Sequence, residues 1–373
     1  MKKIISACTD IKVKYNKKIE YPLVMTENVF SLNNDNILIG GQKQGGRRFV
    51  VVDSFIYNNY KDPLHSYFDN RNIEAKIISF KAGESNKNMD SFSSLFTNLN
   101  EFQVNRRSEP IIAIGGGVTT DIVGFLASVY RRGVPHVKIP TTLMGYVDAS
   151  VGIKTGINFG NDKNRMGTFE PPAGVILDKS FLKTLDSRHI INGVGEIIKL
   201  GIIKDLHLFE LLESYGKSAI DSNFQKNSED ILDKSIRMML EELEPNLYEE
   251  NLSRSVDFGH TFSPAIEMNS TTELLHGEAV SIDVAFSSVI SFNRNLINKG
   301  DLNRIFNLVK KLQLPYQHAS LLPDLLWDSV IERTYHRDGY QRVPLPSPLG
   351  HCIFINDLKK EEVVKACKNI GEI

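Results

Sequence analysis

The chain has 373 residues, too many for one ordinary hydrophobic core and a length that suits two domains. Apolar residues make up 41% and charged residues 24%, and 44 basic against 45 acidic side chains leave a net charge of −1. This balanced composition is typical of a globular protein and argues against binding to nucleic acid or to anionic membranes.

The cysteines and the N-terminal segment bear on the compartment. Cys8, Cys352 and Cys367 lie far apart without a CxxC pair, which argues against a disulfide framework and a thiolate metal site and favours the cytoplasm. The apolar run in the opening MKKIISAC is shorter than the roughly 7–15 residues of a secretion signal. We therefore interpret it as the start of a first strand. The chain also contains no run of about 18 apolar residues, so we expect no transmembrane span.

The first half alternates Val- and Ile-rich runs with helix-length segments. Such runs fall within residues 47–57, 74–80, 109–130 and 136–144. Short β-rich runs separated by helices predict βαβ units and a parallel sheet. We therefore expect residues 1–180 to form an α/β nucleotide-binding domain.

The second half has a different pattern. Apolar residues recur at helical spacing through residues 179–216, 229–244, 277–297 and 303–314. We expect residues 181–373 to form a mainly α-helical domain that binds metal and substrate. No flexible linker separates the halves, which favours a site between two closely packed domains.

Gly115, Gly116 and Gly117 lie between an apolar strand and an amphipathic helix. Backbone amides in such a turn can approach a pyrophosphate, although the GxGxxG spacing is absent and a simple tight turn is an equal alternative. Asp53 ends the strand FVVVD and could bind a ribose hydroxyl or merely form a turn. Glu84 and Lys87, in GESNK, read more simply as a solvated surface pair.

Residues 140–169 combine many small residues with little regular periodicity. Long irregular segments inside compact domains are usually functional. Its glycines would let Lys154, Lys163 and Asn164 converge on an anionic ligand such as a phosphate, with Asp148 nearby. A glycine-rich surface loop with solvated lysines is the alternative.

Glu196, His260 and His276 are candidate metal ligands. Each lies in or beside an apolar helical segment, where a polar group needs a partner to be buried. Two histidines and one carboxylate can form a catalytic zinc site with an open fourth position. No HExxH spacing links them, so histidines satisfied within the core remain an equal alternative. Lys199 follows Glu196 on the same helical face.

Five ordered motifs now stand out: GGGVTTDIVGFLASVYRRG, IPTTL with VDASVGIKTGIN, GVGEIIKLGII, DFGHTF and LLHGEAV. From about residue 50 to residue 290 the chain resembles the sugar phosphate cyclases, whose best known member is 3-dehydroquinate synthase. The resemblance implies a dehydroquinate synthase-like fold, with an NAD-binding α/β domain, a helical domain, zinc or cobalt in the cleft, and a homodimer.

The resemblance also implies roles for individual residues. Glu196, His260 and His276 correspond to the metal ligands. Asp148, Lys154, Asn164 and Lys199 fall at substrate positions, and Arg132 corresponds to an arginine that reaches the substrate phosphate across the dimer interface. The positions that contact the cofactor correspond to Asp53, Glu84, Lys87, Gly115, Gly116, Gly117, Thr119, Asp121, Thr141, Thr142, Phe181 and Thr184.

The reaction implied by the family uses NAD without consuming it. NAD accepts hydride from a carbinol that the metal polarises, phosphate leaves by β-elimination, the hydride returns, and an intramolecular aldol closes the ring.

Four positions depart from the dehydroquinate synthase pattern. Those enzymes have a second histidine where this chain has Pro264, a lysine at Met239, an arginine about at Ser253 and an asparagine at Asp257. The changes remove partners for a substrate carboxylate. They resemble the branch that cyclises sedoheptulose 7-phosphate, which has a hydroxymethyl group instead. Pro264 is tolerable if it lies in the first turn of a helix.

We therefore expect conversion of sedoheptulose 7-phosphate to 2-epi-5-epi-valiolone. Alternatives are a 2-epi-valiolone synthase, 3-dehydroquinate synthase itself and, more distantly, a metal-dependent alcohol dehydrogenase. A non-catalytic binding protein would not need this combination of lysines, metal ligands and nucleotide loop. His336, Arg337 or Arg342 could also replace the lost cations, which would favour an anionic substrate.

Overall fold

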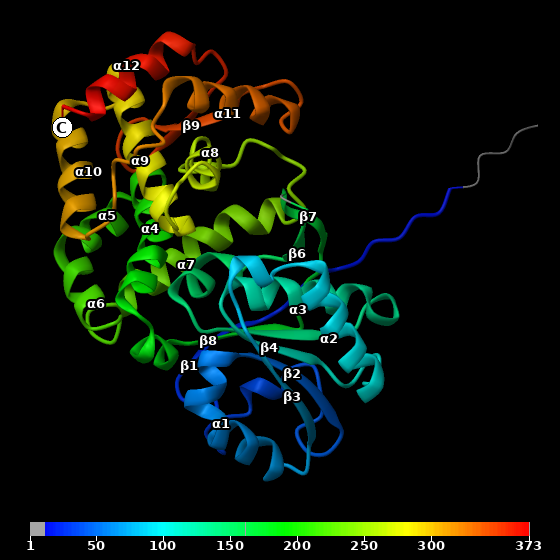
Figure 1. The fold of residues 1–373 in the computed structure, drawn as a ribbon. Coiled ribbons are helices and arrows are strands. Elements are labelled where there is room, and N and C mark those ends of the chain that lie inside the picture. Colours follow the sequence, from blue (N-terminus) through cyan, green and yellow to red (C-terminus); the bar gives the residue numbers. More distant parts are fainter. Residues whose placement is uncertain (1–11, 161, 373) are drawn as a thin grey trace, which may run out of the picture.

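The computed structural model describes residues 12–160 and 162–372 (Figure 1). The segment MKKIISAC, expected to begin a first strand, lies outside the described residues.

A six-stranded sheet forms the first half of the described chain, with every neighbouring pair parallel. Its strands, in spatial order, are β1 (Leu23–Thr26), β8 (Gly174–Asp178), β5 (His136–Pro140), β4 (Ile111–Gly115), β2 (Arg47–Asp53) and β3 (Glu74–Phe80). Every residue of β4 and β5 is buried, as expected of central parallel strands covered on both faces. Gly115 pairs with Pro140, so the turns that follow β4 and β5 meet at one edge.

Three helices cover the two faces of this sheet. α1 (Ser54–Asp69) packs on one face, whereas α2 (Met89–Phe102) and α3 (Gly117–Val129) pack on the other. Each of these helices follows a strand directly or through a short loop, which is the predicted βαβ pattern.

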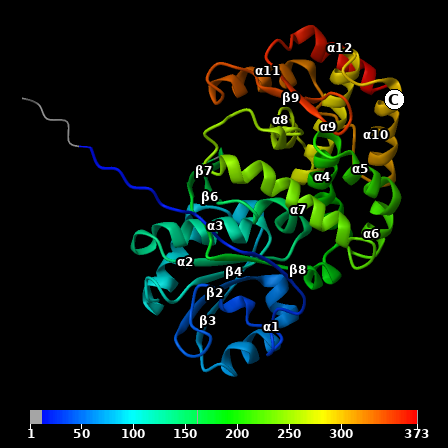
Figure 2. The same cartoon turned by 180° about the vertical axis from the view of Figure 1, so that it is seen from behind.

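Residues 140–169, expected to be irregular, are more regular than their composition indicates. They contain the π-helical turn η4 (Gly145–Ala149) and an antiparallel hairpin of β6 (Lys154–Phe159) and β7 (Asp162–Phe169). Gly156 and Gly167 face each other across the hairpin, where a Cβ on either would lie within 2.7 Å of backbone. The glycines therefore serve close strand pairing. The hairpin lies between the sheet and the helical half (Figures 1 and 2).

The second half is mainly helical, as predicted. Its helices are α4 (Ser187–Ile203), α5 (Leu206–Leu211), α6 (Lys217–Asp221), α7 (Glu229–Leu243), α8 (Ser263–Met268), α9 (His276–Asn293), α10 (Lys299–Lys311), α11 (Pro323–Tyr335) and α12 (Lys360–Ile370). α9 is buried along most of its length and contacts α4, α8, α10 and α12. A small antiparallel pair, β9 (Val343–Pro346) with β10 (Cys352–Ile355), was not predicted. Across the described residues, the helices are all too short or too polar to span a membrane.

Candidate active site

The structure brings Glu196, His260 and His276 together at one point. Their potential ligand atoms all lie within 4.8 Å of one another. The Oε1 atom of Glu196 lies 3.5 Å from Nε2 of His276 and 3.8 Å from Nε2 of His260. The three residues come from α4, the turn before α8 and the first position of α9.

A close crossing of α4 and α9 places Glu196 beside His276. A Cβ on Gly195 would lie 2.3 Å from the carbonyl oxygen of Gly277, and a Cβ on Gly277 would lie 1.9 Å from the carbonyl oxygen of Asn192. The side chain of Asn192 also accepts a hydrogen bond from the Gly277 N–H at 2.7 Å. Only glycine permits this backbone contact, which explains GVGE and HGE in the two motifs.

Hydrogen bonds to a side chain of α9 hold the turn that carries His260. Asp283 accepts hydrogen bonds from the N–H groups of Phe262 (2.6 Å) and Ser263 (2.9 Å) at the start of α8. Pro264 is the second residue of α8, where a missing N–H costs little because no intrahelical partner exists there. The predicted position of this proline in a first helical turn is confirmed.

The donor set fits a divalent cation. Glu196 is fully buried, and among the described residues neither of its carboxylate oxygens accepts a hydrogen bond, although Lys199 contacts Oε2. Burial opposes its charge, but Lys199, His260 and His276 hold its pKa below the ordinary value. Such an ionised carboxylate beside two imidazole Nε2 atoms is a zinc-type ligand set.

The histidines have different electrostatic surroundings. Burial lowers the pKa of His260 to about 3, so this ring is neutral, as a metal ligand must be. Burial also opposes a charge on His276, but contacts with Glu196 and Glu267 raise its pKa to about 10, so a metal must displace the Nε2 proton of this ring when it binds. Glu267 was not predicted, because a carboxylate seven residues after His260 has no recognisable spacing.

The predicted glycine turn lies at the carboxyl edge of the sheet. β4 ends at Gly115, α3 begins at Gly117, and no side chain caps this helix. Cβ atoms on Gly115 and Gly116 would lie 2.5 Å from Thr119 and 3.0 Å from Thr142. The Thr119 hydroxyl is buried without a hydrogen-bond partner in the described part of the chain. Uncapped amides and a free hydroxyl fit an anionic group such as a pyrophosphate.

The other predicted cofactor residues fall into two groups. Asp53 ends β2 and caps α1 by accepting from the Phe55 N–H at 2.8 Å, while Thr141 donates its N–H to the Gly115 carbonyl at 3.0 Å. Both therefore lie at the carboxyl edge of the sheet. Phe181 instead packs in the core against Tyr60, with ring centroids 5.3 Å apart. The Thr184 hydroxyl donates to the Phe181 carbonyl at 3.3 Å.

The interpretation of Glu84 and Lys87 as a solvated pair is wrong for Lys87. Lys87 is 4% exposed, and its ammonium donates to Asp121 and Asn164, at 2.6 Å each. Glu84 accepts from the Asn158 amide of β6 at 2.8 Å. The loop before α2 is thus tied to the hairpin and to α3, since a buried ammonium requires such partners.

The predicted substrate residues are partly gathered around the metal-ligand cluster. Burial and the charge of Glu196 raise the pKa of Asp148 in η4, and Lys199 donates to the Val256 carbonyl at 3.0 Å. The exposed Lys154 lies 3.0 Å from Glu249. Lys163 lies 2.6 Å from Glu267.

Arg132 lies apart from these residues. It is an exposed residue at the end of the turn η3 (Tyr130–Arg132), which follows α3 and has Tyr130 buried. Among the described residues its side chain has no recorded contact with the cluster.

The charge pattern inferred at Met239, Ser253 and Asp257 needs correction. Met239 is 2% exposed and belongs to the core. The Asp257 carboxylate contacts Arg254 at 2.6 Å, Arg333 at 3.1 Å and Arg337 at 2.5 Å. Burial opposes its charge, but these arginines lower its pKa. The region has thus not lost its cations, and Asp257 is not an isolated negative charge.

Two other candidates for replacement cations do not join this group. Arg342 lies 3.4 Å from Asp338, and His336 is exposed. Arg333, which the sequence did not single out, also donates to the His260 carbonyl at 3.3 Å. Arg333 lies 76 residues after Asp257 in the chain, so the sequence alone did not indicate that the two side chains are in contact.

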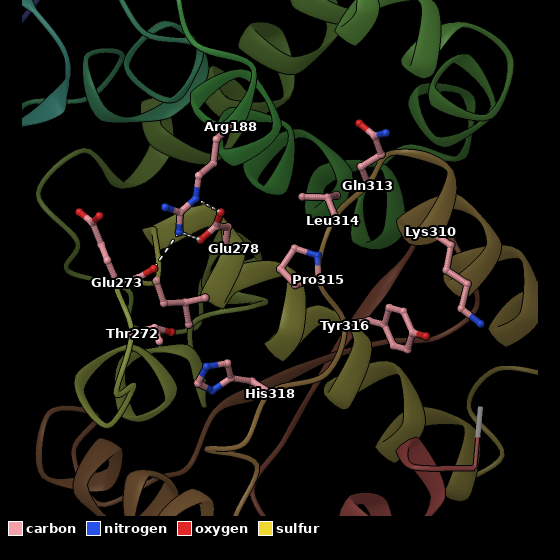
Figure 3. A pocket seen from close by; sticks show the side chains of 11 residues that line it. Arg188, Thr272, Glu273, Glu278, Lys310, Gln313, Leu314, Pro315, Tyr316 and His318 are labelled. Carbon is pink, nitrogen blue, oxygen red and sulfur yellow. Dashed lines mark hydrogen bonds and ion pairs between the residues drawn. The ribbon is translucent and has the colours of Figure 1, made fainter.

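A separate groove of about 560 Å³ lies beside the first turns of α4 and α9. Figure 3 shows Arg188 paired with Glu278 on one side of it and Tyr316 on another. None of the predicted site residues lines it, so we place the candidate site at the metal-ligand cluster.

Two family models cover most of the chain. Residues 77–192 match the model described as 3-dehydroquinate synthase N-terminal, and residues 193–336 match the one described as 3-dehydroquinate synthase C-terminal. The chain belongs to the 3-dehydroquinate synthase family.

Among individual proteins, the chain is similar to 2-epi-5-epi-valiolone synthases. It is 44% identical to that of Streptomyces albus, over 95% of this chain and 88% of the relative, and 41% identical to that of an Actinomyces species, over 95% and 96%. The structure of a 2-epi-5-epi-valiolone synthase from Streptomyces hygroscopicus subsp. jinggangensis, with NAD+ and Zn2+ bound, superposes with a TM-score of 0.92. It is 40% identical, over 97% of this chain and 99% of that one.

Proposed function

We propose that the chain converts sedoheptulose 7-phosphate to 2-epi-5-epi-valiolone with loss of phosphate. The observation that carries this proposal is identity of 40–44% to proteins of that activity along nearly the whole chain. The metal-ligand cluster and the glycine turn supply the chemical groups that such a reaction needs. The enzyme is a phosphate-eliminating lyase, and the reaction has no net redox change.

The cofactors are NAD and zinc or cobalt, which supply reversible hydride acceptance and polarisation of a substrate hydroxyl when bound. Glu196, His260 and His276 hold the metal. The amides after Gly115 hold the pyrophosphate, as the lack of a side-chain cap on α3 supports.

The remaining site residues bind substrate and orient it. Lys199 forms an ion pair with Glu196, and the charge of Glu196 raises the pKa of Asp148. Both residues are therefore suited to bind the hydroxyl groups of the sugar and to move protons. Lys154 and Asn164 bind its phosphate, together with Arg132 from the second subunit of a homodimer. We place the domain boundary at residue 180 and the enzyme in the cytoplasm.

One observation favours 3-dehydroquinate synthase as a second candidate. Arg254, Arg333 and Arg337 surround the single carboxylate of Asp257. Arg254 also contacts Glu249, so three positive charges face two carboxylates, and the one remaining positive charge could bind an anionic substrate.

Phosphate release tests the proposal. The purified protein with NAD and Co2+ is given sedoheptulose 7-phosphate, and inorganic phosphate and absorbance of NADH are followed together. We expect many phosphates per enzyme with no accumulating NADH. Equimolar NADH would instead indicate an alcohol dehydrogenase, and absence of phosphate would contradict any cyclase acting on this sugar.

A further inference from the structure

Glu267 on α8 links a candidate metal ligand to the β6–β7 hairpin. Its Oε2 atom lies 3.5 Å from Nδ1 of His276, and its Oε1 atom lies 2.6 Å from Nζ of Lys163 on β7. The Glu267 side chain is 16% exposed, whereas those of Lys163 and His276 are 42% and 41% exposed.

The two histidines of the cluster have unequal partners. Nδ1 of His260 lies 3.3 Å from the Phe258 carbonyl, a neutral acceptor. Nδ1 of His276 faces the charged carboxylate of Glu267. In both rings Nε2 points to Oε1 of Glu196. A proton held on Nδ1 leaves the lone pair on Nε2, which is the atom that would bind a metal.

We propose that Glu267 is a positioning residue for His276, and that Lys163 acts through Glu267 rather than on the substrate. The proposal rests on the metal site of the proposed function. Glu267 fixes the tautomer and the angle of the His276 ring, and its charge makes Nε2 a stronger donor. Lys163 fixes Glu267 in turn.

The same contact couples the hairpin to the metal site. β6 and β7 carry Lys154 and Asn164, the proposed phosphate-binding residues, and Lys163 directly precedes Asn164. Asn164 is itself held by Lys87 at 2.6 Å. The Lys163–Glu267 pair therefore joins the sheet-bound hairpin to α8. Loss of either partner should loosen both His276 and the hairpin.

Metal affinity without substrate tests the proposal directly. Co2+ is titrated into metal-free protein against a competing chelator, and the visible absorption of the bound cobalt is recorded. Glu267→Gln keeps the shape of the side chain but removes its charge. We expect affinity about 10–100-fold weaker, the usual cost of losing such a partner, together with an altered cobalt spectrum.

Variants of Lys163 separate positioning from direct substrate binding. Lys163→Met should weaken Co2+ binding less than Glu267→Gln does, because the carboxylate remains. The double variant should bind Co2+ about as weakly as Glu267→Gln alone, because both changes break one contact. Glu250→Gln and Arg165→Met are matched controls, since both side chains are exposed, and neither should change affinity or spectrum.

The outcomes distinguish the positioning role of Glu267 from the metal site of the proposed function, on which it rests. Parent-like Co2+ affinity and spectrum in Glu267→Gln would overturn the role of Glu267. Parent-like metal binding in Lys163→Met, with a raised KM for the sugar, would show that Lys163 binds the substrate directly and does not act through Glu267. A parent protein that binds no Co2+ would overturn the metal site itself. Circular dichroism checks that each variant is folded.

Discussion

Asp257 shows how far a single residue can mislead when its neighbours are unknown. In sequence it stands as an added carboxylate in a pocket that has lost cations. In the structure Arg254, Arg333 and Arg337 all contact it. Arg333 and Arg337 lie about 80 residues further along the chain, so no local pattern predicts the contact. The carboxylate is part of an ionic cluster that also reaches the His260 carbonyl.

Asp257→Asn should destabilise the protein. Removal of one partner from a buried ionic group leaves the others without compensation, which typically costs about 3–5 kcal/mol in the free energy of unfolding. Urea denaturation followed by circular dichroism measures the change. Asp233→Asn is the control, because its pair with Arg237 is exposed and should contribute less than about 1 kcal/mol. Equal stability of the two variants would contradict a structural role for the cluster.

The proposed metal ligands could be predicted as individual residues but not as a cluster. Glu196, His260 and His276 stand out because they occur beside apolar segments within recognisable motifs. Spacing alone left ligands and core histidines equally open. The geometry adds the decisive fact that two Nε2 atoms lie within 3.8 Å of Oε1 of a fully buried carboxylate, whose other oxygen contacts Lys199.

His260→Ala and His276→Ala should each lose bound metal while keeping the fold. Each substitution removes one of the three proposed ligands. The space left by the imidazole ring lies at the edge of the site rather than in the hydrophobic core, so the fold should be kept. Metal content per chain after gel filtration measures the effect, and circular dichroism measures the fold. Full metal content with normal turnover in either variant would contradict the assignment of that histidine.

At the scale of elements, the crossing of α4 and α9 determines the site. Their backbones are in direct contact at Gly195 and Gly277. The neighbouring residues Glu196 and His276 are therefore brought close together in space. The helical periodicity predicted both helices. It could not predict their contact, because a glycine in a helix has several uses. The same reason hid the hairpin of β6 and β7, whose glycines resemble those of an irregular loop.

Gly195→Ala should separate the two helices. The added methyl would lie 2.3 Å from the Gly277 carbonyl oxygen, and backbone cannot move aside as a side chain can. We expect a loss of about 1–3 kcal/mol in unfolding free energy, with weaker Co2+ binding. Gly371→Ala is the control, because its nearest contact is 3.4 Å away. Unchanged metal affinity in Gly195→Ala would contradict the importance of the crossing.

The whole molecule combines a sheet whose carboxyl edge is suited to NAD with a helical half that carries the three proposed metal ligands. The alternation of strands and helices in residues 47–144, and the helical periodicity after residue 179, were sufficient to predict this plan. The short strands β1, β8, β9 and β10 were not predicted, because runs of four or five residues carry little periodicity. The sequence predicted sedoheptulose 7-phosphate as the substrate because cations were inferred to be lost near Asp257. The structure shows that this reason was incorrect, since three arginines contact Asp257.

The most direct test of the proposed substrate is phosphate release from two sugars at equal concentration: sedoheptulose 7-phosphate and the carboxylated seven-carbon sugar phosphate that 3-dehydroquinate synthases cyclise. Because Asp257 and Glu249 already neutralise two of the three charges of Arg254, Arg333 and Arg337, the carboxylated sugar should make at least one charge-assisted hydrogen bond fewer than it would with unpaired cations. Such a loss corresponds to about tenfold or more in kcat/KM. We predict rapid release from sedoheptulose 7-phosphate, with a C7 cyclitol identified by NMR. Comparable or faster release from the carboxylated sugar would contradict the account.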